Sequence, residues 1–200
     1  MIDFITNIDF SILYWIQDNL RNSVMDFLMP LFSNMQNSGL IWIAIAIVLI
    51  FFKRTRYCGF AILLAMGIDT LITECGIKNI VCRVRPCNLV NDVDMLVEKP
   101  NSYSFPSNHS ASAFAAATAV LLTVKKKAWS IPAFIFSGII AFSRVYVFVH
   151  FPSDVLVGIV LGSTVAVLVC YLMKKTGFKA LLERKNIIAK EVSQLETTDH

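Results

Sequence analysis

The sequence has little charge for its length. Asp, Glu, Lys and Arg together make up 16% of the 200 residues, whereas apolar and aromatic residues with cysteine make up 56%. The mean hydropathy is +0.64. A soluble domain carries about 25% charged residues, so this composition excludes an ordinary soluble globule and indicates a protein embedded in a bilayer.

Other absences narrow the choice further. The five cysteines and three histidines show no spacing typical of a zinc site. Met1 is followed by Asp3, Asp9 and Asp18 rather than by a basic segment and a cleavage site, so we expect no removable signal peptide. Most Lys and Arg fall in short clusters between apolar stretches, which is typical of topology signals. We therefore expect no nucleic-acid partner, despite the net charge of +4.

Five apolar stretches are candidates for membrane helices, because a helix of about 20 residues spans a hydrocarbon core of roughly 30 Å. They lie at residues 38–53, 57–77, 109–124, 129–148 and 154–173. Residues 1–34 alternate apolar and charged positions, which favours interfacial amphipathic helices, with a sixth crossing as the alternative. The sequence therefore predicts an all-α fold, a polytopic membrane helix bundle of five to six transmembrane helices plus N-terminal interfacial helices.

Three basic clusters set the expected orientation of these helices. They are KRTR at residues 53–56, KKK at 125–127 and KK at 174–175. If all three are cytoplasmic, the five stretches alternate in direction without contradiction. The loop 78–108 and the turn 149–153 then lie on the outer face of the cell membrane. The expected division is into interfacial helices (1–34), a transmembrane domain (35–175) and a polar cytoplasmic tail (176–200).

Three polar sets stand at the outer ends predicted for the apolar stretches. Single groups of this kind often only snorkel or cap a helix, but an ionisable group near lipid costs a few kcal/mol unless it has a partner. Several cations and histidines at one depth indicate a shared partner, and phosphate suits Arg. The sets are KNIVCRVRP with Lys78, Arg83 and Arg85, FPSNHS with Ser107, Asn108 and His109, and SRVYVFVHFPSD with Arg144, His150 and Asp154. We therefore predict a phosphate-binding site.

The local pattern within these sets agrees with that prediction. Ser107 stands at the entry of a predicted helix, so free backbone N–H groups near Asn108 and His109 would point at a bound oxyanion. His150 and Asp154 are four residues apart, so one helix face carries both if the last helix begins at His150. An Asp that holds one ring nitrogen leaves the other nitrogen free as a nucleophile or base.

Two acids and two cysteines near these sets have other expected roles. Glu74 lies four residues before Lys78 and is expected to pair with it along a helix. Asp69 lies deeper, and we expect it to form a structural hydrogen bond to a neighbouring helix. Cys82 and Cys87 are expected to be free thiols, with a disulfide as the alternative if their loop faces an oxidising compartment.

The three sets resemble the signature of the type 2 phosphatidic acid phosphatase (lipid phosphate phosphatase) superfamily. Its pattern is K, six residues, R-P; then P-S-G-H; then S-R, five residues, H, three residues, D. Lys78 and Arg85 match the first motif, and the third matches throughout. Asn108 stands where the pattern has Gly, which leaves His109 in register. The resemblance covers roughly residues 70–165, and three ordered motifs make it specific.

The resemblance implies how these residues would bind a phosphate. Lys78, Arg85 and Arg144 would clamp its oxygens, and Ser107 and the backbone amide near Asn108 would add hydrogen bonds. Because these fixed cations stabilise the charge, the resemblance implies no metal and no other cofactor.

The resemblance also implies a reaction sequence. His150 would attack phosphorus and form a phosphohistidine intermediate, and Asp154 would orient its ring. His109 would protonate the leaving oxygen and then activate water. The expected function is therefore that of a membrane lipid phosphatase with two catalytic histidines.

The substrate is expected to be a lipid phosphate or diphosphate at the outer face of the bilayer. The sequence resembles bacterial envelope members of this superfamily, so the first candidate substrate is undecaprenyl diphosphate. This lipid is the spent carrier of wall synthesis. Phosphatidylglycerophosphate and phosphatidate are the alternatives, and a non-catalytic phospholipid-binding or transport protein is a further one. The expected partners are thus a lipid substrate and the membrane, and the sequence sets no oligomeric state.

Overall fold

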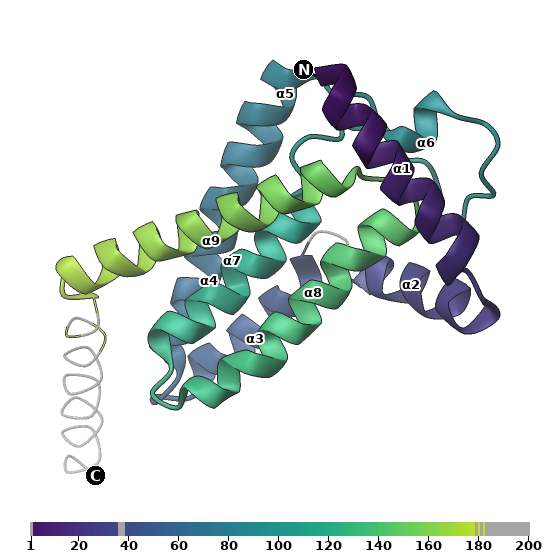
Figure 1. Cartoon of the computed structure of the whole chain (residues 1–200). Coiled ribbons are helices and arrows are strands. Elements are labelled where there is room, and N and C mark those ends of the chain that lie inside the picture. The colour runs from purple at the N-terminus through teal and green to yellow at the C-terminus, as the bar shows by residue number, and fades with distance from the viewer. Residues whose placement is uncertain (1, 36–38, 179, 181, 183–200) are drawn as a thin grey trace, which may run out of the picture.

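The computed structural model describes residues 2–35, 39–178, 180 and 182, and every regular element in these ranges is helical (Figure 1). The elements are α1 (Ile2–Leu20), α2 (Ser23–Met35), α3 (Leu40–Phe51), α4 (Arg56–Thr70), the π-helix η2 (Leu71–Ile77), α5 (Lys78–Val81), α6 (Pro86–Leu89), α7 (Asn108–Thr123), the 3-10 helix η3 (Lys127–Trp129), α8 (Ser130–Tyr146) and α9 (Pro152–Lys175). The predicted all-α class is confirmed. Most of the polar tail predicted for 176–200 lies outside the described residues.

Helix α7 occupies the centre of the bundle, where it packs against α4, α8 and α9. Its buried positions are mainly small residues: Ser110, Ala111, Ser112, Ala113, Ala115, Ala116, Ala117, Thr118 and Ala119. A Cβ added at Gly162 of α9 would lie 1.9 Å from the carbonyl oxygen of Ala111. The backbones of α7 and α9 therefore touch, which small residues permit in membrane bundles.

Three helical stretches are long and apolar enough to cross a membrane, and α2 with α3 makes a fourth if the bent pair is one span. The three are Arg56–Leu89, Lys127–Tyr146 and Pro152–Lys175. Helix α7 has 16 residues and is enclosed by the others, so it does not need the length of a lipid-facing span. A membrane bundle is thus supported, and the predicted number of five to six spans stays a prediction.

The N-terminal helices α1 and α2 lie against the bundle as two separate short helices (Figure 1). Helix α1 is not among the helices that qualify as spans in the described part of the chain. It exposes Phe4, Ile8 and Trp15 while burying Leu13 and Asp9. These exposed apolar side chains are suited to contact with lipid, and the interfacial placement and the domain boundaries predicted for residues 1–34 stay predictions.

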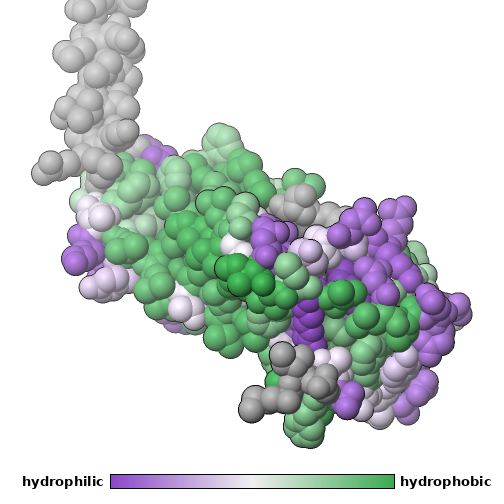
Figure 2. Space-filling view, turned by 90° about the horizontal axis from the view of Figure 1, so that it is seen from above, coloured by the Kyte–Doolittle hydropathy of each residue, from purple (hydrophilic) through white to green (hydrophobic). Residues whose placement is uncertain are grey.

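The basic clusters and the predicted site residues lie at opposite ends of the bundle. Helix α4 begins beside the KRTR cluster and continues through η2 to Lys78, whereas α9 begins beside Asp154 and ends at Lys175. In Figure 2, hydrophobic residues cover the middle of the face, and hydrophilic residues gather at the end that carries α1 and α6. The side of the membrane on which each end lies stays a prediction.

The structure tests two further expectations, the hydrogen bond of Asp69 and the state of the cysteines. Asp69 is fully buried in α4, and neither carboxylate oxygen has a hydrogen-bond partner among the described residues. The expected interhelical hydrogen bond is therefore wrong, because no described polar side chain reaches this carboxylate. All five cysteines are free thiols, so Cys82 and Cys87 are not joined.

Candidate active site

Three buried cations lie at the end of the bundle that carries the predicted catalytic residues (the catalytic end). They come from three separate segments. Lys78 opens α5, Arg85 precedes α6 and Arg144 stands in the last turn of α8; their exposed fractions are 4%, 3% and 5%. Lys78 Nζ lies 2.6 Å from Glu74 Oε1, which confirms the predicted pair. The π-helix η2 directly precedes Lys78, and such irregular turns are frequent at functional sites. The predicted cationic clamp is thus buried and built on helix ends.

The His150 side chain contacts the clamp directly. Arg85 Nη1 lies 2.9 Å from His150 Nε2. Since a guanidinium only donates, Nε2 accepts this hydrogen bond, and the proton of the neutral imidazole sits on Nδ1. Nδ1 faces Asp154 Oδ2 at 3.7 Å. The ring therefore presents a lone pair to the clamp and its N–H to the carboxylate.

The helix that carries Asp154 begins two residues after His150. Helix α9 starts at Pro152, because proline fits the first helical position and cannot donate a backbone hydrogen bond. His150 therefore precedes the helix, so the condition for a shared helical face is not met. The backbone N–H of Phe151 donates to Asp154 Oδ2 at 3.0 Å. Asp154 thus caps α9 and faces His150 through a turn rather than along a helix.

The surroundings of His150 keep its ring neutral. The side chain is 1% exposed. Burial lowers the pKa of His150 well below its usual value, and the positive charges of Arg85, Arg144 and Lys78 lower it further. All three clamp cations are therefore close enough to act on this ring. A neutral imidazole is the form that can attack phosphorus.

The carboxylate of Asp154 is held by Arg83, which the sequence had grouped only with the phosphate-binding cations. Arg83 Nη1 donates to Asp154 Oδ1 at 2.6 Å, and Nη2 donates to Asp9 Oδ2 at 2.8 Å. The Arg83 guanidinium also lies over the Phe151 ring at 4.0 Å. Asp9, on α1, additionally accepts the backbone N–H of Ser153 at 3.0 Å. The interfacial helix α1 is therefore joined to the carboxylate beside His150.

Sequence reasoning missed this role of Asp9 and Arg83. The side chain of Asp9 is 3% exposed. In the sequence, the amphipathic pattern of residues 1–34 had placed Asp9 on the charged, water-facing side of a helix. Helix α2 makes a similar contact, since Arg144 Nη1 donates to the buried hydroxyl of Ser33. Both N-terminal helices thus hold residues of the site, which no spacing within 70–165 could indicate.

The start of α7 uses its side chains differently from the prediction. Ser107 is the N-cap of α7, and its hydroxyl lies 3.0 Å from that of Ser110. Asn108 Oδ1 accepts a hydrogen bond from Thr73 Oγ1 at 2.9 Å. The Ser107 and Asn108 side chains therefore have protein partners, and the Ser110 N–H donates to the Ser107 hydroxyl. The Asn108 and His109 N–H groups have no acceptor within the helix, and their binding of an oxyanion stays a prediction.

The Asn108 contact explains what this residue can do in place of glycine. Thr73 is fully buried in η2, the helix that leads into Lys78. The Asn108–Thr73 hydrogen bond therefore ties the segment that carries Lys78 to the helix that carries His109. A glycine at position 108 could not make this contact.

Several buried polar atoms around this cluster have no hydrogen-bond partner in the described part of the chain. They are His109 Nε2, His150 Nδ1 and Arg144 Nε. Buried polar atoms are normally satisfied, and an anion bound among the cations would supply partners for His109 Nε2 and Arg144 Nε, whereas His150 Nδ1 faces Asp154 at 3.7 Å. No group of three or more His, Cys, Asp or Glu side chains in the described ranges is arranged to hold a metal ion. The arrangement suits phosphate binding and attack by His150.

Curated relatives of the chain are phosphatases by name. An undecaprenyl-diphosphatase of Sulfolobus acidocaldarius is 38% identical over 128 residues, which cover 64% of this chain and 61% of that protein. Phosphatidylglycerophosphatase B of Bacillus subtilis is 35% identical over 143 residues, which cover 67% of this chain and 64% of that protein. The matches thus span under two thirds of the length of these relatives.

A solved structure and a family model agree with these relatives. The crystal structure of a transmembrane PAP2-type phosphatidylglycerolphosphate phosphatase from Bacillus subtilis matches with a TM-score of 0.69 at 28% identity. The match covers 85% of this chain and 86% of that one. The PAP2 superfamily model matches residues 56–178, a range that includes all eight predicted site residues. This chain therefore belongs to the PAP2 superfamily.

Proposed function

We propose that this chain is an integral membrane lipid phosphatase that hydrolyses undecaprenyl diphosphate to undecaprenyl phosphate and phosphate at the outer face of the membrane. The observation that carries the proposal is the neutral His150, whose Nε2 meets Arg85 at 2.9 Å and whose Nδ1 faces Asp154. A nucleophile, an orienting carboxylate and a phosphate clamp in contact are the parts that phosphoryl transfer needs.

In the first step, His150 Nε2 attacks the terminal phosphorus as the bond from phosphorus to the bridging oxygen breaks. His109 gives a proton to the departing lipid phosphate. The imidazole gains positive charge as the N–P bond forms, and the Asp154 carboxylate stabilises that charge. Arg83 keeps the carboxylate in place through its 2.6 Å contact. Lys78, Arg85 and Arg144 neutralise the phosphoryl oxygens.

In the second step, water attacks the phosphohistidine. His109 takes a proton from this water, the N–P bond breaks, and phosphate leaves with the oxygen of the water. His150 returns to its neutral form and His109 to its protonated form. His109 lies within electrostatic range of His150 and of all three clamp cations. The same side chain can therefore give a proton to the departing lipid phosphate and then take one from the attacking water.

Two lipid classes are supported as substrates. The relative that favours undecaprenyl diphosphate is the Sulfolobus enzyme, at 38% identity. The second candidate is phosphatidylglycerophosphate, and it is supported by a longer match of 143 residues to the Bacillus subtilis enzyme and by the solved structure. Phosphatidate is a third lipid with the same terminal phosphate.

The test measures phosphate release by the purified full chain in detergent, with a chelator present, from undecaprenyl diphosphate, phosphatidylglycerophosphate and phosphatidate. We expect the highest kcat/KM for undecaprenyl diphosphate and no release by His150→Ala. His200→Ala removes the third histidine of the chain and is the matched control, which should keep full activity. No release from any of the three lipids by the native chain would instead indicate a non-catalytic lipid-binding protein.

Trapping the intermediate tests the nucleophile itself. With substrate labelled at the terminal phosphate, the native chain should carry an acid-labile label. His109→Ala should accumulate this label because hydrolysis of the intermediate is slowed. His150→Ala should carry none, and an equal label on His150→Ala would remove the nucleophile assignment.

Labelling with an impermeant maleimide tests the outer-face placement. Cys82 is an exposed free thiol at the catalytic end, so in intact cells it should react. Cys75 is also exposed, so both tests use a Cys75→Ser background; with Cys82→Ser added, Lys126→Cys at the basic end should react only after the cells are opened. Reaction of both positions from the same side would contradict the proposed orientation.

A further inference from the structure

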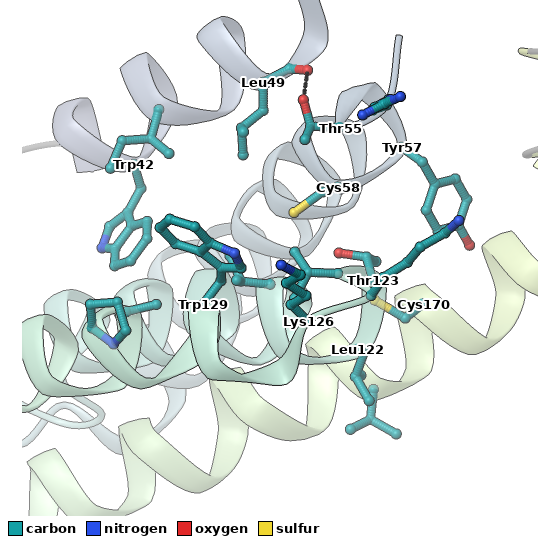
Figure 3. Close-up of a pocket in the computed structure, with 18 of the residues that line it drawn as sticks. Trp42, Leu49, Thr55, Tyr57, Cys58, Leu122, Thr123, Lys126, Trp129 and Cys170 are labelled. Atoms are coloured by element: carbon teal, nitrogen blue, oxygen red, sulfur yellow. Dashed lines mark hydrogen bonds between the residues drawn. The ribbon is translucent and has the colours of Figure 1, made fainter. Parts of the chain in front are cut away.

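A large cavity lies at the end of the bundle that carries the basic clusters, away from the candidate active site. Its volume is about 1130 Å³, and side chains of α3, α4, α7, α8 and α9 line it (Figure 3). Pockets for drug-sized ligands have volumes of about 300–1,000 Å³. The cavity is therefore of the size needed for a lipid chain rather than for a single ion.

The body of the cavity is apolar. Trp42 and Leu49 on α3, Val120 on α7, Phe136 on α8 and Val167 on α9 contribute to its walls. Trp42 is nine residues before the end of α3 at Phe51, which places it about 14 Å from that helix end at 1.5 Å per residue. Half of a hydrocarbon core of roughly 30 Å has a similar depth. The cavity thus reaches across about one leaflet.

The rim of the cavity is cationic. Four lining residues are basic and come from all three basic clusters of the sequence: Arg54, Lys125, Lys126 and Lys174. No acidic residue is among the described residues that line the cavity. Thr55 Oγ1 donates to the Leu49 carbonyl oxygen at 2.8 Å, the dashed line in Figure 3. This contact folds the α3–α4 turn back over the end of α3 and holds Arg54 beside the opening.

Aromatic residues mark the depth of the rim. Tyr57, Trp129 and Tyr171 line the cavity together with the four cations. Tyr and Trp concentrate at the headgroup level of membrane proteins, where one end of the ring is apolar and the other is wet. An apolar body one leaflet deep, an aromatic belt and a ring of cations follow one another in the order of a phospholipid's acyl chains, ester region and phosphate.

We propose that this cavity is a second lipid site, which binds an anionic phospholipid of the leaflet opposite to the catalytic end. One acyl chain enters the apolar body, and the phosphate and its anionic headgroup meet Arg54, Lys126 and Lys174. The site is separate from catalysis, because His109 and His150 both lie at the other end of the bundle. It stands on the cavity and its charges and does not depend on the substrate proposed above.

Bromine quenching of tryptophan fluorescence tests the site on the full chain. The chain has three tryptophans, so Trp15→Phe with Trp129→Phe leaves Trp42 as a reporter on the cavity wall. The protein is reconstituted in phosphatidylcholine vesicles with increasing fractions of phosphatidylglycerol brominated on its acyl chains. The parallel series uses brominated phosphatidylcholine. We expect half-maximal quenching at a fraction of phosphatidylglycerol at least about fivefold lower, the effect of one Lys or Arg near an anionic lipid.

Two matched variants decide whether the rim cations cause this preference. Arg54→Gln with Lys174→Gln removes two lining cations and should bring the two quenching curves together. Lys53→Gln with Lys175→Gln removes the same charge from adjacent exposed positions that do not line the cavity, and should keep the preference. Ala133→Phe narrows the cavity and should lower quenching of Trp42 by either lipid.

Three outcomes would overturn the proposal. The first is equal quenching of Trp42 by the two lipids when the rim cations are unchanged, which would mean that bulk lipid fills the cavity. The second is a preference that persists in Arg54→Gln with Lys174→Gln or that disappears equally in the adjacent control. The third is a Trp42 signal that no brominated lipid quenches, which would mean that another occupant, such as a segment of the chain itself, fills the cavity.

Discussion

At the catalytic end of the bundle, side chains are held by hydrogen bonds between residues that lie far apart in the sequence, whereas at the basic end such bonds run mostly within one helical turn. Arg83 joins Asp9 to Asp154, over 74 and 71 positions. At the other end, Thr123 Oγ1 donates to the Ala119 carbonyl oxygen one turn earlier. Between the two ends, small residues bring α7 and α9 into backbone contact.

This difference shows which physical demand each region meets. Charges at the catalytic end are buried, and a buried charge is costly unless it is paired and hydrogen-bonded. The long-range contacts satisfy these charges and fix their positions. Most cations at the basic end, among them Lys53, Lys126 and Lys175, are exposed and remain in contact with water. Substitutions at the catalytic end should therefore affect activity, and substitutions in the middle of the bundle should affect stability. Substitutions at exposed basic positions that line no site should affect neither property.

The largest effect is expected for His150→Ala. Loss of the nucleophile should lower kcat on the order of 10³-fold or more, because the group that forms the covalent intermediate is removed. The matched substitution at the basic end is Lys53→Gln, which should change kcat less than twofold. Both variants are assayed with the same lipid, and the melting temperature of each is recorded to exclude unfolding. Similar losses in the two would erase the contrast between the ends.

A smaller effect is expected for Arg83→Lys. Lysine keeps the charge but cannot bridge Asp9 and Asp154 with two N–H groups in a fixed plane. We expect kcat to fall about 10- to 100-fold with little change in KM, as for other residues that orient a catalytic group.

Asp9→Asn breaks the same bridge from the other side. The double variant should therefore lose little more than Arg83→Lys alone, since both substitutions remove one network. Purely additive losses in kcat would show that Asp9 and Arg83 act separately.

The middle of the bundle is tested by two glycines. Gly162→Ala places a methyl group 1.9 Å from the Ala111 oxygen, and such overpacking should cost about 1–3 kcal/mol of unfolding free energy. Gly138 has no atom within 4 Å of an added Cβ, so Gly138→Ala in α8 should stabilise by about 0.4–1 kcal/mol. Thermal unfolding in detergent measures both. Equal shifts would contradict the close α7–α9 contact.

A small effect on activity is expected for the Thr73–Asn108 hydrogen bond. In a double-mutant cycle with Thr73→Val and Asn108→Gly, the coupling free energy in kcat/KM should be about 0.5–1.5 kcal/mol. Asn108→Gly also restores the family pattern, so its activity shows what the asparagine adds. A coupling near zero would mean that the contact does not position Lys78 or His109.

Much of the site could be read from the sequence because its motifs are local. The spacing of Lys78 to Arg85 and of Arg144 to Asp154 is fixed by the chain, and the pairing of Lys78 with Glu74 follows from one helical turn. The family and the all-α membrane class are confirmed for the same reason. The position of His150 was harder to predict, because proline rather than periodicity decided where α9 begins.

The sequence alone indicated that the chain enters a bilayer as helices and that it carries the residues of the proposed phosphate clamp and two histidines, since composition, hydropathy and motif spacing are properties of the linear chain. Tertiary structure alone decided that Asp9 supports Arg83 and Asp154, that Asn108 binds Thr73, and that the basic clusters ring a cavity. These contacts join segments tens of residues apart, and only helix packing brings such segments within hydrogen-bonding distance.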